Sequence, residues 1–442
     1  MSKLYPEIKV KPPGPKGKFI IAKDRKFSSP SYIKAYDLVV ERGEGPWIYD
    51  VDGNRYLDMM AGIATASTGH AHPQVVEAIK KAADKFLHIC GTDFYYESMS
   101  DIVEKLAGYV TGMGPKKVFL TNSGTEAIEG AIKLARFHTK RSNIIAFNGS
   151  FHGRTTGAIA LTSSKIKYRA HFGPLMPGIY HVPFCNPYSD LRETESASPA
   201  IQHIEEELFA TLVSPKEVAA IVLEPVLGEG GYVPPTKFFL KSLRRICDEH
   251  GIMLVYDEVQ SGVGRTGQMY ASEHYGVYPD IYCTAKGLAS GMPLGAIVAK
   301  ESVMTWPRGT HGSTYGGNPV ACAASLATLK IVEGLLPTIR QNGDILIAKL
   351  RQLQERFPVI GSVRGFGYMV GVEFNDPKTK AAAHAYMEDL EQLSFQKGVL
   401  LLGCGASTIR LAPPLIVGQH EFDIMLGTLE ECMVELNKKH KY

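Results

Sequence analysis

The middle of this 442-residue chain, from about residue 116 to residue 299, alternates short apolar runs with segments of helical periodicity. Several runs are apolar at every position rather than at every second one, as in strands that are covered on both faces. Strands that alternate with helices in this way form a mostly parallel sheet. The region therefore predicts an α/β fold, with strands at 117–120, 143–147, 219–223, 252–256, 281–283 and 296–299.

The flanking segments predict smaller elements. The run from Trp47 to Leu57 is typical of a hairpin with an Asp-Gly turn. Helical patterns are expected at 364–374 and 422–437, and the start of the chain at 9–18 predicts an extended arm. We therefore expect an N-terminal arm and hairpin at 1–65, a large domain at 66–330 and a C-terminal small domain at 331–442.

Charge and composition exclude several classes of function. A formal net charge of +3 without basic runs argues against nucleic acid and against an anionic membrane surface. We expect no membrane span, because no apolar stretch approaches about 18 residues, and no signal peptide. Seven scattered cysteines without a Cys-x-x-Cys pattern indicate reduced thiols, hence a cytoplasmic protein. The close pair His70 and His72 lacks further ligands nearby, so no metal is expected.

Two ionisable residues, Asp257 and Lys286, each follow an apolar, strand-like run. Burial of such groups is costly unless a partner is present. One interpretation is a structural ion pair between neighbouring strands. The other is a site for pyridoxal 5'-phosphate, where Lys286 holds the aldehyde as a Schiff base and Asp257 keeps the pyridine nitrogen protonated.

Two glycine-containing turns follow strands. Ser123, Gly124 and Thr125 open a predicted helix, where free N–H groups and the helix dipole favour phosphate, although an ordinary N-cap explains the same residues. The segment 262–267 matches the dinucleotide pattern G-x-G-x-x-G. No long helix opens at its end, so we expect a tight loop beneath a ligand instead.

Charged residues after other strands suit a carboxylate ligand. Arg154 and Arg410 could each bind a carboxylate through two hydrogen bonds, so that together they suit a dicarboxylate. The alternative is that they are surface or ion-paired arginines. Glu224 and Glu229 follow the strand expected at 219–223, and the carboxyl ends of parallel strands are where α/β sites are built.

Taken together, these motifs resemble those of the class III (ω-amino-acid) aminotransferases, in particular the 4-aminobutyrate and ornithine aminotransferases. The resemblance runs from about residue 48 to residue 414, and its specific motifs lie at 122–127, 151–155, 224–226, 257–267, 285–287 and 313–319. It implies a fold type I PLP-dependent transferase. Such a fold has a large domain with a mostly parallel seven-stranded sheet and a small α+β domain formed by the two chain ends.

The resemblance assigns roles around the cofactor. Lys286 would form the Schiff base and act as general base, and Asp257 would pair with the pyridine nitrogen. Gln260 would bind the ring oxygen O3′, and Phe151 would stack on the ring. The remaining cofactor-binding residues implied are Ser123, Gly124 and Thr125 at the phosphate, His152, Glu224, and Thr314 from the neighbouring subunit.

The resemblance also assigns substrate-binding residues. Arg154 would bind the distal carboxylate and Arg410 the α-carboxylate, while Glu229 would pair with Arg410 when an ω-amine donor is bound. Ile63 and Tyr95 belong to segments that line the substrate side in such enzymes, but these segments match no single subfamily. The amino donor is therefore left open.

The implied activity is a ping-pong transfer of an amino group from a 4-aminobutyrate- or ornithine-like donor to 2-oxoglutarate, a 2-oxo acid acceptor. The implied assembly is a homodimer with shared active sites, or a dimer of such dimers. An amino-acid racemase or epimerase on the same fold uses the same lysine and is the alternative. A non-catalytic protein is disfavoured because the lysine, the aspartate and the phosphate turn are all present, and the two arginines favour transamination.

Overall fold

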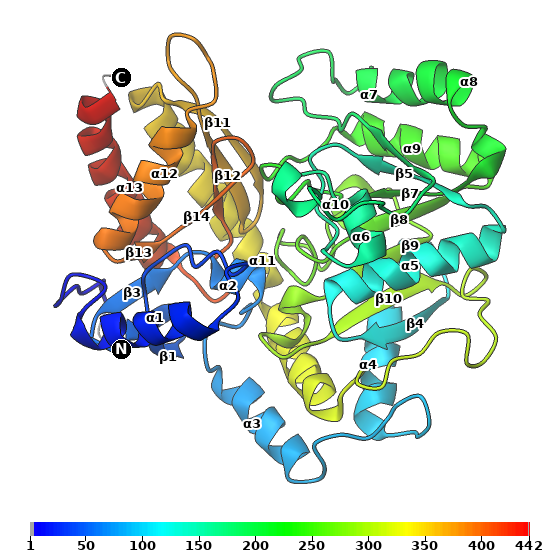
Figure 1. The fold of residues 1–442 in the computed structure, drawn as a ribbon, viewed down its shortest axis with the longest axis horizontal. Coiled ribbons are helices and arrows are strands. Elements are labelled where there is room, and N and C mark those ends of the chain that lie inside the picture. Colours follow the sequence, from blue (N-terminus) through cyan, green and yellow to red (C-terminus); the bar gives the residue numbers. More distant parts are fainter. Residues whose placement is uncertain (1–3, 441) are drawn as a thin grey trace.

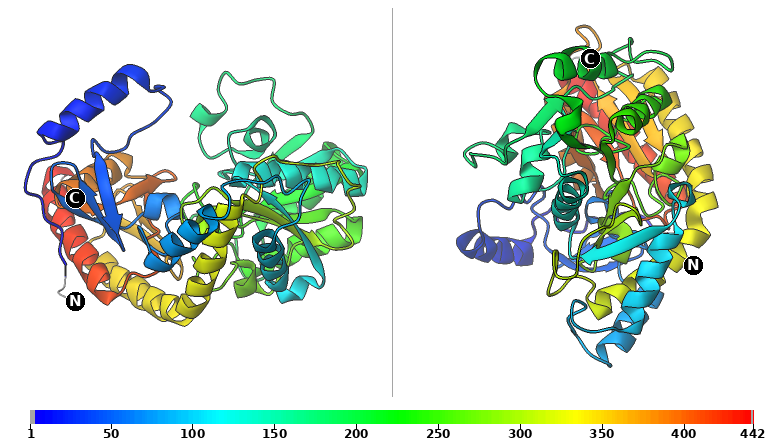
Figure 2. Two further views of the ribbon diagram at one scale, coloured as in Figure 1. Left: turned by 90° about the horizontal axis from the view of Figure 1, so that it is seen from below. Right: turned by 90° about the vertical axis from the view of Figure 1, so that its right-hand side faces the viewer.

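The computed structural model describes residues 4–440 and 442 of the chain. These residues form two lobes, one around a seven-stranded sheet and the other around two four-stranded sheets. Figure 1 shows helix α11 (Pro319–Arg356) passing from the larger lobe to the smaller one. Figure 2 shows that the two ends of the described chain both lie on the smaller lobe.

The seven-stranded sheet has the order β4-β10-β9-β8-β7-β5-β6. Strand β10 runs antiparallel to both of its neighbours, β4 and β9. The pairs β5–β6, β5–β7, β7–β8 and β8–β9 are all parallel. The strands are β4 (Lys116–Thr121), β5 (Asn143–Phe147), β6 (Ile179–Val182), β7 (Val218–Leu223), β8 (Met253–Asp257), β9 (Ile281–Thr284) and β10 (Gly295–Lys300). The predicted mostly parallel α/β sheet is confirmed, with strand ends within about a residue of those expected.

Strand β6 was not expected from the sequence. It lies at the edge of the sheet, and three of its four residues are only partly buried. An edge strand with this mixture of residues lacks the continuous apolar run that identified the other strands.

Helices cover both faces of the large sheet. Ile144 and Ala146 of β5 pack in one core with helix α5 (Gly124–Thr139) and helix α6 (Thr156–Leu161), while Ile145 and Phe147 pack in the other core with helix α9 (Lys237–His250). Alternate residues of a strand point to opposite faces. Burial on both faces therefore explains why these strands are apolar at every position.

Other short elements connect the strands of the larger lobe. The remaining helices there are α3 (Pro73–Ala83), α4 (Glu97–Gly108), α7 (Pro199–Gln202), α8 (Phe209–Thr211) and α10 (Ser272–Tyr275). The 3-10 or π turns are η1 (Thr111–Met113), η2 (Ile166–Tyr168), η3 (His203–Leu208), η4 (Pro215–Glu217) and η5 (Lys286–Ala289).

The smaller lobe combines both ends of the chain. One sheet contains β1 (Val40–Glu44), β2 (Trp47–Asp50), β3 (Arg55–Asp58) and β13 (Val399–Leu400), and the other contains β11 (Ile360–Phe366), β12 (Met369–Phe374), β15 (Thr408–Leu411) and β14 (Leu402–Cys404). Its helices are α1 (Pro15–Phe27), α2 (Ala61–Ala64), α12 (His384–Gln396) and α13 (Gln419–His440). The predicted hairpin is β2–β3, and the predicted C-terminal helix lies within α13.

Two local predictions are wrong. The segment 364–374 is not a helix but most of the antiparallel pair β11–β12, in which Gly365 and Gly367 have positive φ angles of 133° and 52°. Glycine tolerates such angles, and they reverse the chain where a helix would continue. The arm at 9–18 is not extended to its end, because helix α1 begins at Pro15, a favourable residue for the first helical turn.

The division into three segments stays a prediction. Strand β13 pairs in parallel with β3, so residues from both chain ends share one sheet. Helix α11 runs through residue 330, where the second boundary is expected.

Helix α11 is the one helix of the described chain that is long and apolar enough to cross a membrane by length and composition. Its qualifying 18-residue window has a mean hydropathy of 1.5, so the expectation that no stretch would reach this limit is wrong. Half of that window is buried within the protein, and the helix packs against α3, α4 and β11. Such burial is typical of a core helix in a globular protein.

The buried carboxylate of Asp280 joins three elements of the larger lobe. It accepts hydrogen bonds from Arg244 of α9 at 2.9 Å, from Lys300 of β10 at 2.7 Å and from the backbone N–H of Leu254 in β8 at 2.9 Å. We expect Asp280→Ala to lower the free energy of unfolding by about 3 kcal/mol, because two cations lose their buried partner.

The measurement is the melting temperature at one fixed scan rate, since a chain of this size often unfolds irreversibly. Asp248→Ala is the matched control, because Asp248 also pairs with Arg244, at 2.8 Å, but is mostly exposed. Exposed pairs contribute about 1 kcal/mol or less. Equal effects of the two substitutions would contradict the structural role given to Asp280.

Candidate active site

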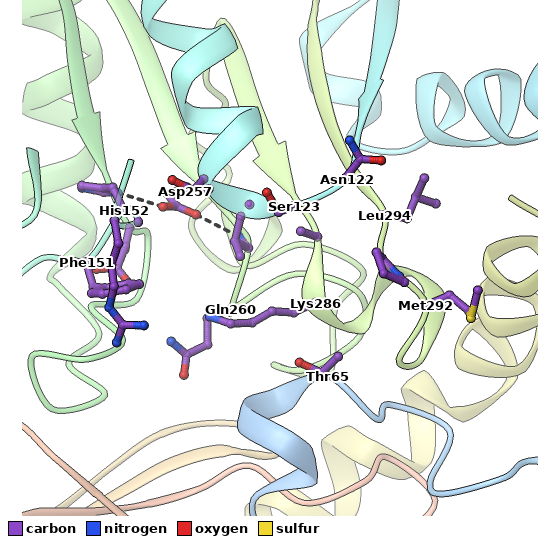
Figure 3. A pocket seen from close by; sticks show the side chains of 18 of the residues that line it. Thr65, Asn122, Ser123, Phe151, His152, Asp257, Gln260, Lys286, Met292 and Leu294 are labelled. Carbon is purple, nitrogen blue, oxygen red and sulfur yellow. Dashed lines mark hydrogen bonds and ion pairs between the residues drawn. The ribbon is translucent and has the colours of Figure 1, made fainter. Parts of the chain in front are cut away.

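A cavity of about 400 Å³ opens at the carboxyl ends of the parallel strands of the large sheet (Figure 3). Ser123 follows β4, His152 follows β5 and Glu224 follows β7, while Asp257 ends β8 and Lys286 follows β9. All five line the cavity. Because these strands are parallel, their carboxyl ends meet at one edge of the sheet and bring together residues from distant parts of the chain.

Asp257 is buried and forms an ion pair with His152. The Nδ1 atom of His152 lies 2.8 Å from one carboxylate oxygen of Asp257, and the backbone N–H of Val259 donates to the other oxygen at 3.0 Å. Burial alone would lower the pKa of His152, but the hydrogen bond to Asp257 and its negative charge outweigh burial and raise the pKa. The contact with His152 therefore holds the Asp257 carboxyl group in the cavity lining, where it can serve a cationic ligand atom.

Lys286 is buried, and no hydrogen bond or ion pair joins its amine to another residue in the described part of the chain. Burial lowers its pKa, although the nearby carboxylates of Asp257 and Glu224 oppose this effect. The structural ion pair of Asp257 with Lys286, considered from the sequence, is thus not formed. A lowered pKa favours the unprotonated amine, which is a nucleophile and a proton acceptor.

The backbone at Lys286 is strained. Its φ angle is +42°, in the left-handed region that residues other than glycine rarely adopt. The cost of such a conformation is of order 1–3 kcal/mol, and residues that carry it concentrate at functional sites. The Lys286 side chain lies in the cavity beside Gln260, as Figure 3 shows.

The turn that opens helix α5 is both an N-cap and a candidate phosphate site, the two functions considered from the sequence. Ser123 is the N-cap, and its side-chain oxygen accepts a long hydrogen bond of 3.4 Å from the N–H of Glu126. The N–H groups of Gly124 and Thr125 belong to the first turn and have no partner within the helix. A Cβ atom on Gly124 would lie 2.7 Å from the side chain of Val259. Glycine therefore lets a ready-made anion site lie directly against the loop that follows Asp257.

Glu224 holds the loops on either side of the cavity together. Its two oxygens accept hydrogen bonds from the N–H groups of Phe151, at 2.9 Å, and Gly228, at 3.0 Å. Burial raises the pKa of Glu224 to about 7, against the opposing positive charge of His152. The contact with Phe151 fixes the backbone of a residue whose aromatic ring lines the cavity.

Gln260 is oriented by Tyr232. The hydroxyl of Tyr232 donates to the side-chain oxygen of Gln260 at 2.8 Å, which leaves the amide nitrogen available to donate to a ligand. A Cβ atom on Gly228 would lie 2.5 Å from that nitrogen, so glycine is needed there. Tyr232 was not identified from the sequence.

Arg410 and Glu229 form a buried ion pair beside the cavity. The distance between Arg410 Nη1 and a Glu229 oxygen is 2.8 Å, while the buried Nε of Arg410 has no protein partner among the described residues. Lys165 binds the other oxygen of Glu229 at 3.0 Å. Burial would raise the pKa of Glu229, but the cations Arg410 and Lys165 outweigh it and lower the pKa.

Arg154 lies at the mouth of the cavity and is exposed. Its guanidinium stacks over the rings of Tyr168, with 4.8 Å to the centroid, and Phe151, with 5.4 Å. No carboxylate of the described residues forms an ion pair with it. A held but unpaired guanidinium is suited to a ligand carboxylate.

Five expected site residues lie outside the cavity lining of the single chain: the pair Arg410 and Glu229, and the three exposed residues Ile63, Tyr95 and Thr314. Ile63 has a φ angle of +65° and is exposed, Tyr95 is fully exposed, and Thr314 is exposed on the segment before α11. None of the three lines the cavity. Their roles toward substrate or across a subunit boundary therefore stay predictions.

The glycine-rich segment 262–267 does not lie beneath the cavity. A Cβ atom on Gly264 would lie 2.4 Å from Val332, and one on Gly267 would lie 2.6 Å from Arg340, both on α11. These glycines let the loop pack closely against the long helix. The prediction of a loop beneath a ligand is wrong.

Several cavity residues were given no role from the sequence. Asn122 and Val259 lie within the motifs at 122–127 and 257–267, whereas Thr65, Met292 and Leu294 lie outside the quoted motifs. Asn122 alone carries a local signal, since its backbone N–H donates to Glu126 at 2.7 Å as part of the helix start.

The groups at the cavity fit pyridoxal phosphate. A buried lysine without an ion-pair partner suits its aldehyde, a buried carboxyl group suits its pyridine nitrogen, and a helix N-terminus suits its phosphate. The cavity contains each of these groups. Within the described residues, no set of three or more His, Cys, Asp or Glu side chains is placed to hold a metal ion.

Comparison with known proteins gives one consistent family. The family model described as aminotransferase class-III matches residues 28–433. An alanine/serine racemase of Pyrococcus horikoshii is 36% identical, over 97% of this chain and 93% of that protein. A 5-aminovalerate aminotransferase of Pseudomonas aeruginosa is 38% identical, over 91% of this chain and 94% of that protein. Other matched relatives are named acetylornithine and 4-aminobutyrate aminotransferases, at 37–39% identity.

A solved structure shares the fold and the cofactor chemistry. An amine transaminase from an uncultivated Pseudomonas species, in its PLP-bound form, superimposes with a TM-score of 0.84 and 30% sequence identity. The match covers 92% of this chain and 97% of that chain.

Removal of the buried amine should abolish cofactor retention. We expect wild-type protein incubated with pyridoxal phosphate to keep a visible absorption band after gel filtration, and Lys286→Ala to lose both the band and the cofactor. Lys117→Ala, at an exposed position, is the matched control and should behave as wild type. A band of wild-type strength in Lys286→Ala would assign the attachment to another amine.

Proposed function

The chain belongs to the class III aminotransferase family, and we propose that it transfers an amino group from an ω-amino acid to 2-oxoglutarate. The donor is of the 4-aminobutyrate, 5-aminovalerate or ornithine type, as the names of several relatives suggest. The observation that carries the proposal is the buried pair of Arg410 with Glu229, together with the unpaired Arg154 at the cavity mouth. Two arginines match the two carboxylates of the acceptor.

The cofactor is pyridoxal phosphate, which when bound supplies an aldehyde carbon that carries the amino group and a ring that accepts electrons. Asp257 would hold the pyridine nitrogen in its protonated form, and the start of α5 would bind the phosphate. Gln260 would donate its free amide N–H to the ring oxygen. Phe151, fixed by Glu224, would cover the ring face.

Lys286 would hold the aldehyde and then act as the general base. Burial lowers the pKa of Lys286, which favours the unprotonated Nζ that can take a proton from the carbon that bears the amino group. The same Nζ can return that proton, since a general base that has accepted a proton then acts as a general acid.

The Arg410–Glu229 pair lets one site accept two kinds of substrate. An ω-amine donor has no carboxylate beside its amino group, so Arg410 keeps its bond to Glu229 while the donor reacts. A 2-oxo acid brings such a carboxylate, which would replace Glu229 on Arg410. Arg154 would bind the distal carboxylate in both cases.

An amino-acid racemase is the second candidate, because the matched relative from Pyrococcus horikoshii bears that name. Racemisation needs proton transfer on both faces of the carbon, hence a second base besides Lys286. Glu229 is a weak base for this purpose, since Arg410 and Lys165 lower its pKa. This pairing favours transamination.

The substrate test is a panel of amines with and without 2-oxoglutarate, followed by glutamate formation and by optical rotation in parallel. We expect glutamate to form only when an ω-amino acid and 2-oxoglutarate are both present, because the amino group needs an acceptor. Loss of optical rotation of a single amino acid without any acceptor would establish racemisation instead.

We also propose that the enzyme is a homodimer whose sites are shared between subunits, with a dimer of dimers as a larger form. The support is the family resemblance at Thr314 and the exposed aromatic side chains Phe94, Tyr95 and Tyr315 on nearby segments. If Thr314 acts across the subunit boundary, each site combines Lys286 of one subunit with Thr314 of the other. A heterodimer of a Thr314 variant and a Lys286 variant then contains one intact site.

We therefore expect co-expressed Thr314→Asp and Lys286→Ala chains to recover activity that neither homodimer has, since an aspartate beside the phosphate repels it. Light scattering coupled to size exclusion gives the mass of each assembly. A monomeric mass, or no recovered activity in isolated heterodimers, would contradict the shared site.

A further inference from the structure

Glu229 is bound by two cations at the same time. One of its oxygens lies 2.8 Å from Arg410 on β15, and the other lies 3.0 Å from Lys165. Lys165 belongs to the larger lobe, between α6 and η2, whereas Arg410 belongs to the smaller lobe. The hydroxyl of Tyr168 adds a long hydrogen bond of 3.4 Å on the Lys165 side.

The backbone around Glu229 is held in place. Gly405 donates its N–H to the carbonyl of Glu229 at 2.8 Å, and Arg364 donates to the carbonyl of Gly231 at 2.9 Å. A Cβ atom on Gly230 would lie 2.5 Å from the side chain of Leu227, so this loop is tightly packed. A carboxylate that leaves Arg410 must therefore move by side-chain rotation alone.

When the carboxylate of a 2-oxo acid replaces Glu229 on Arg410, the Glu229 carboxylate needs another partner that it can reach by rotation of its side chain. The side chain of Glu229 is only 11% exposed, so solvation cannot replace the lost ion pair. A buried charge without a partner is strongly unfavourable. Lys165, with 32% of its side chain exposed, already binds the other oxygen and is free to follow it.

We propose that Lys165 is a positioning residue that retains Glu229 when the α-carboxylate of an acceptor occupies Arg410. In the acceptor half-reaction, Lys165 stabilises the Glu229 carboxylate after it has left Arg410. In the donor half-reaction this is not needed, because Arg410 keeps its bond to Glu229. This inference rests on the proposed function. It adds a specificity-determining cation that no sequence motif marks.

The test uses the holoenzyme and its Lys165→Met, Lys165→Arg and Lys167→Met variants. We expect Lys165→Met to raise the KM and the calorimetric Kd of 2-oxoglutarate about tenfold or more, because the displaced Glu229 loses its second cation. The single-turnover rate and apparent affinity with 5-aminovalerate should change by about twofold or less. This split between substrates would not arise from a general structural defect.

The other two variants are controls. Lys165→Arg keeps the cation and should restore binding of 2-oxoglutarate to within about threefold of wild type. Lys167→Met removes a neighbouring, exposed lysine that forms no ion pair among the described residues, and should match wild type.

The outcomes separate the two proposals. A wild-type enzyme that binds 2-oxoglutarate but converts no ω-amine would contradict the proposed donor. Lys165 would then be tested by the calorimetric Kd of 2-oxoglutarate in wild type and in Lys165→Met. Equal weakening of donor and acceptor in Lys165→Met, no weakening, or no recovery with arginine would overturn the role of Lys165. Failure of the wild type to bind 2-oxoglutarate would overturn both proposals.

Discussion

The common direction of strands β4, β5, β7, β8 and β9 is the constraint on which the site depends. Their carboxyl ends meet at one sheet edge, so the residue at the end of each strand faces the same cavity. Helices on both faces bury the sheet and hold its strands in register. The chemistry is therefore built at the ends of buried strands, and the loops add to it.

The charges at this edge are arranged so that every buried carboxylate has a partner while one amine does not. Asp257 binds His152, Glu224 binds two backbone N–H groups, and Glu229 is shared by two cations. Lys286 is left with burial as the largest influence on its pKa. An ion pair would stabilise the protonated amine, whereas the unprotonated amine is the form that reacts with an aldehyde.

Much of the fold and of the cofactor site could be predicted from the sequence, because both rest on local patterns. Continuous apolar runs identified the central strands, and ionisable residues directly after them identified the site. Prediction failed where local patterns are ambiguous. The segment 364–374 was assigned to a helix although its glycines reverse the chain, and the edge strand β6 has no continuous apolar run. Tyr232 and Lys165 carry no motif, since their roles depend only on what they contact.

The sequence by itself determined the residue types of the site and the order in which they follow the strands, hence the kind of cofactor that the chain can hold. Only the tertiary structure decided how the charges pair: Asp257 binds His152 rather than Lys286, and Glu229 lies between Lys165 and Arg410. The physical reason is that an ion pair depends on distances of a few ångströms. Residues 165, 229 and 410 reach such distances only when both lobes have folded.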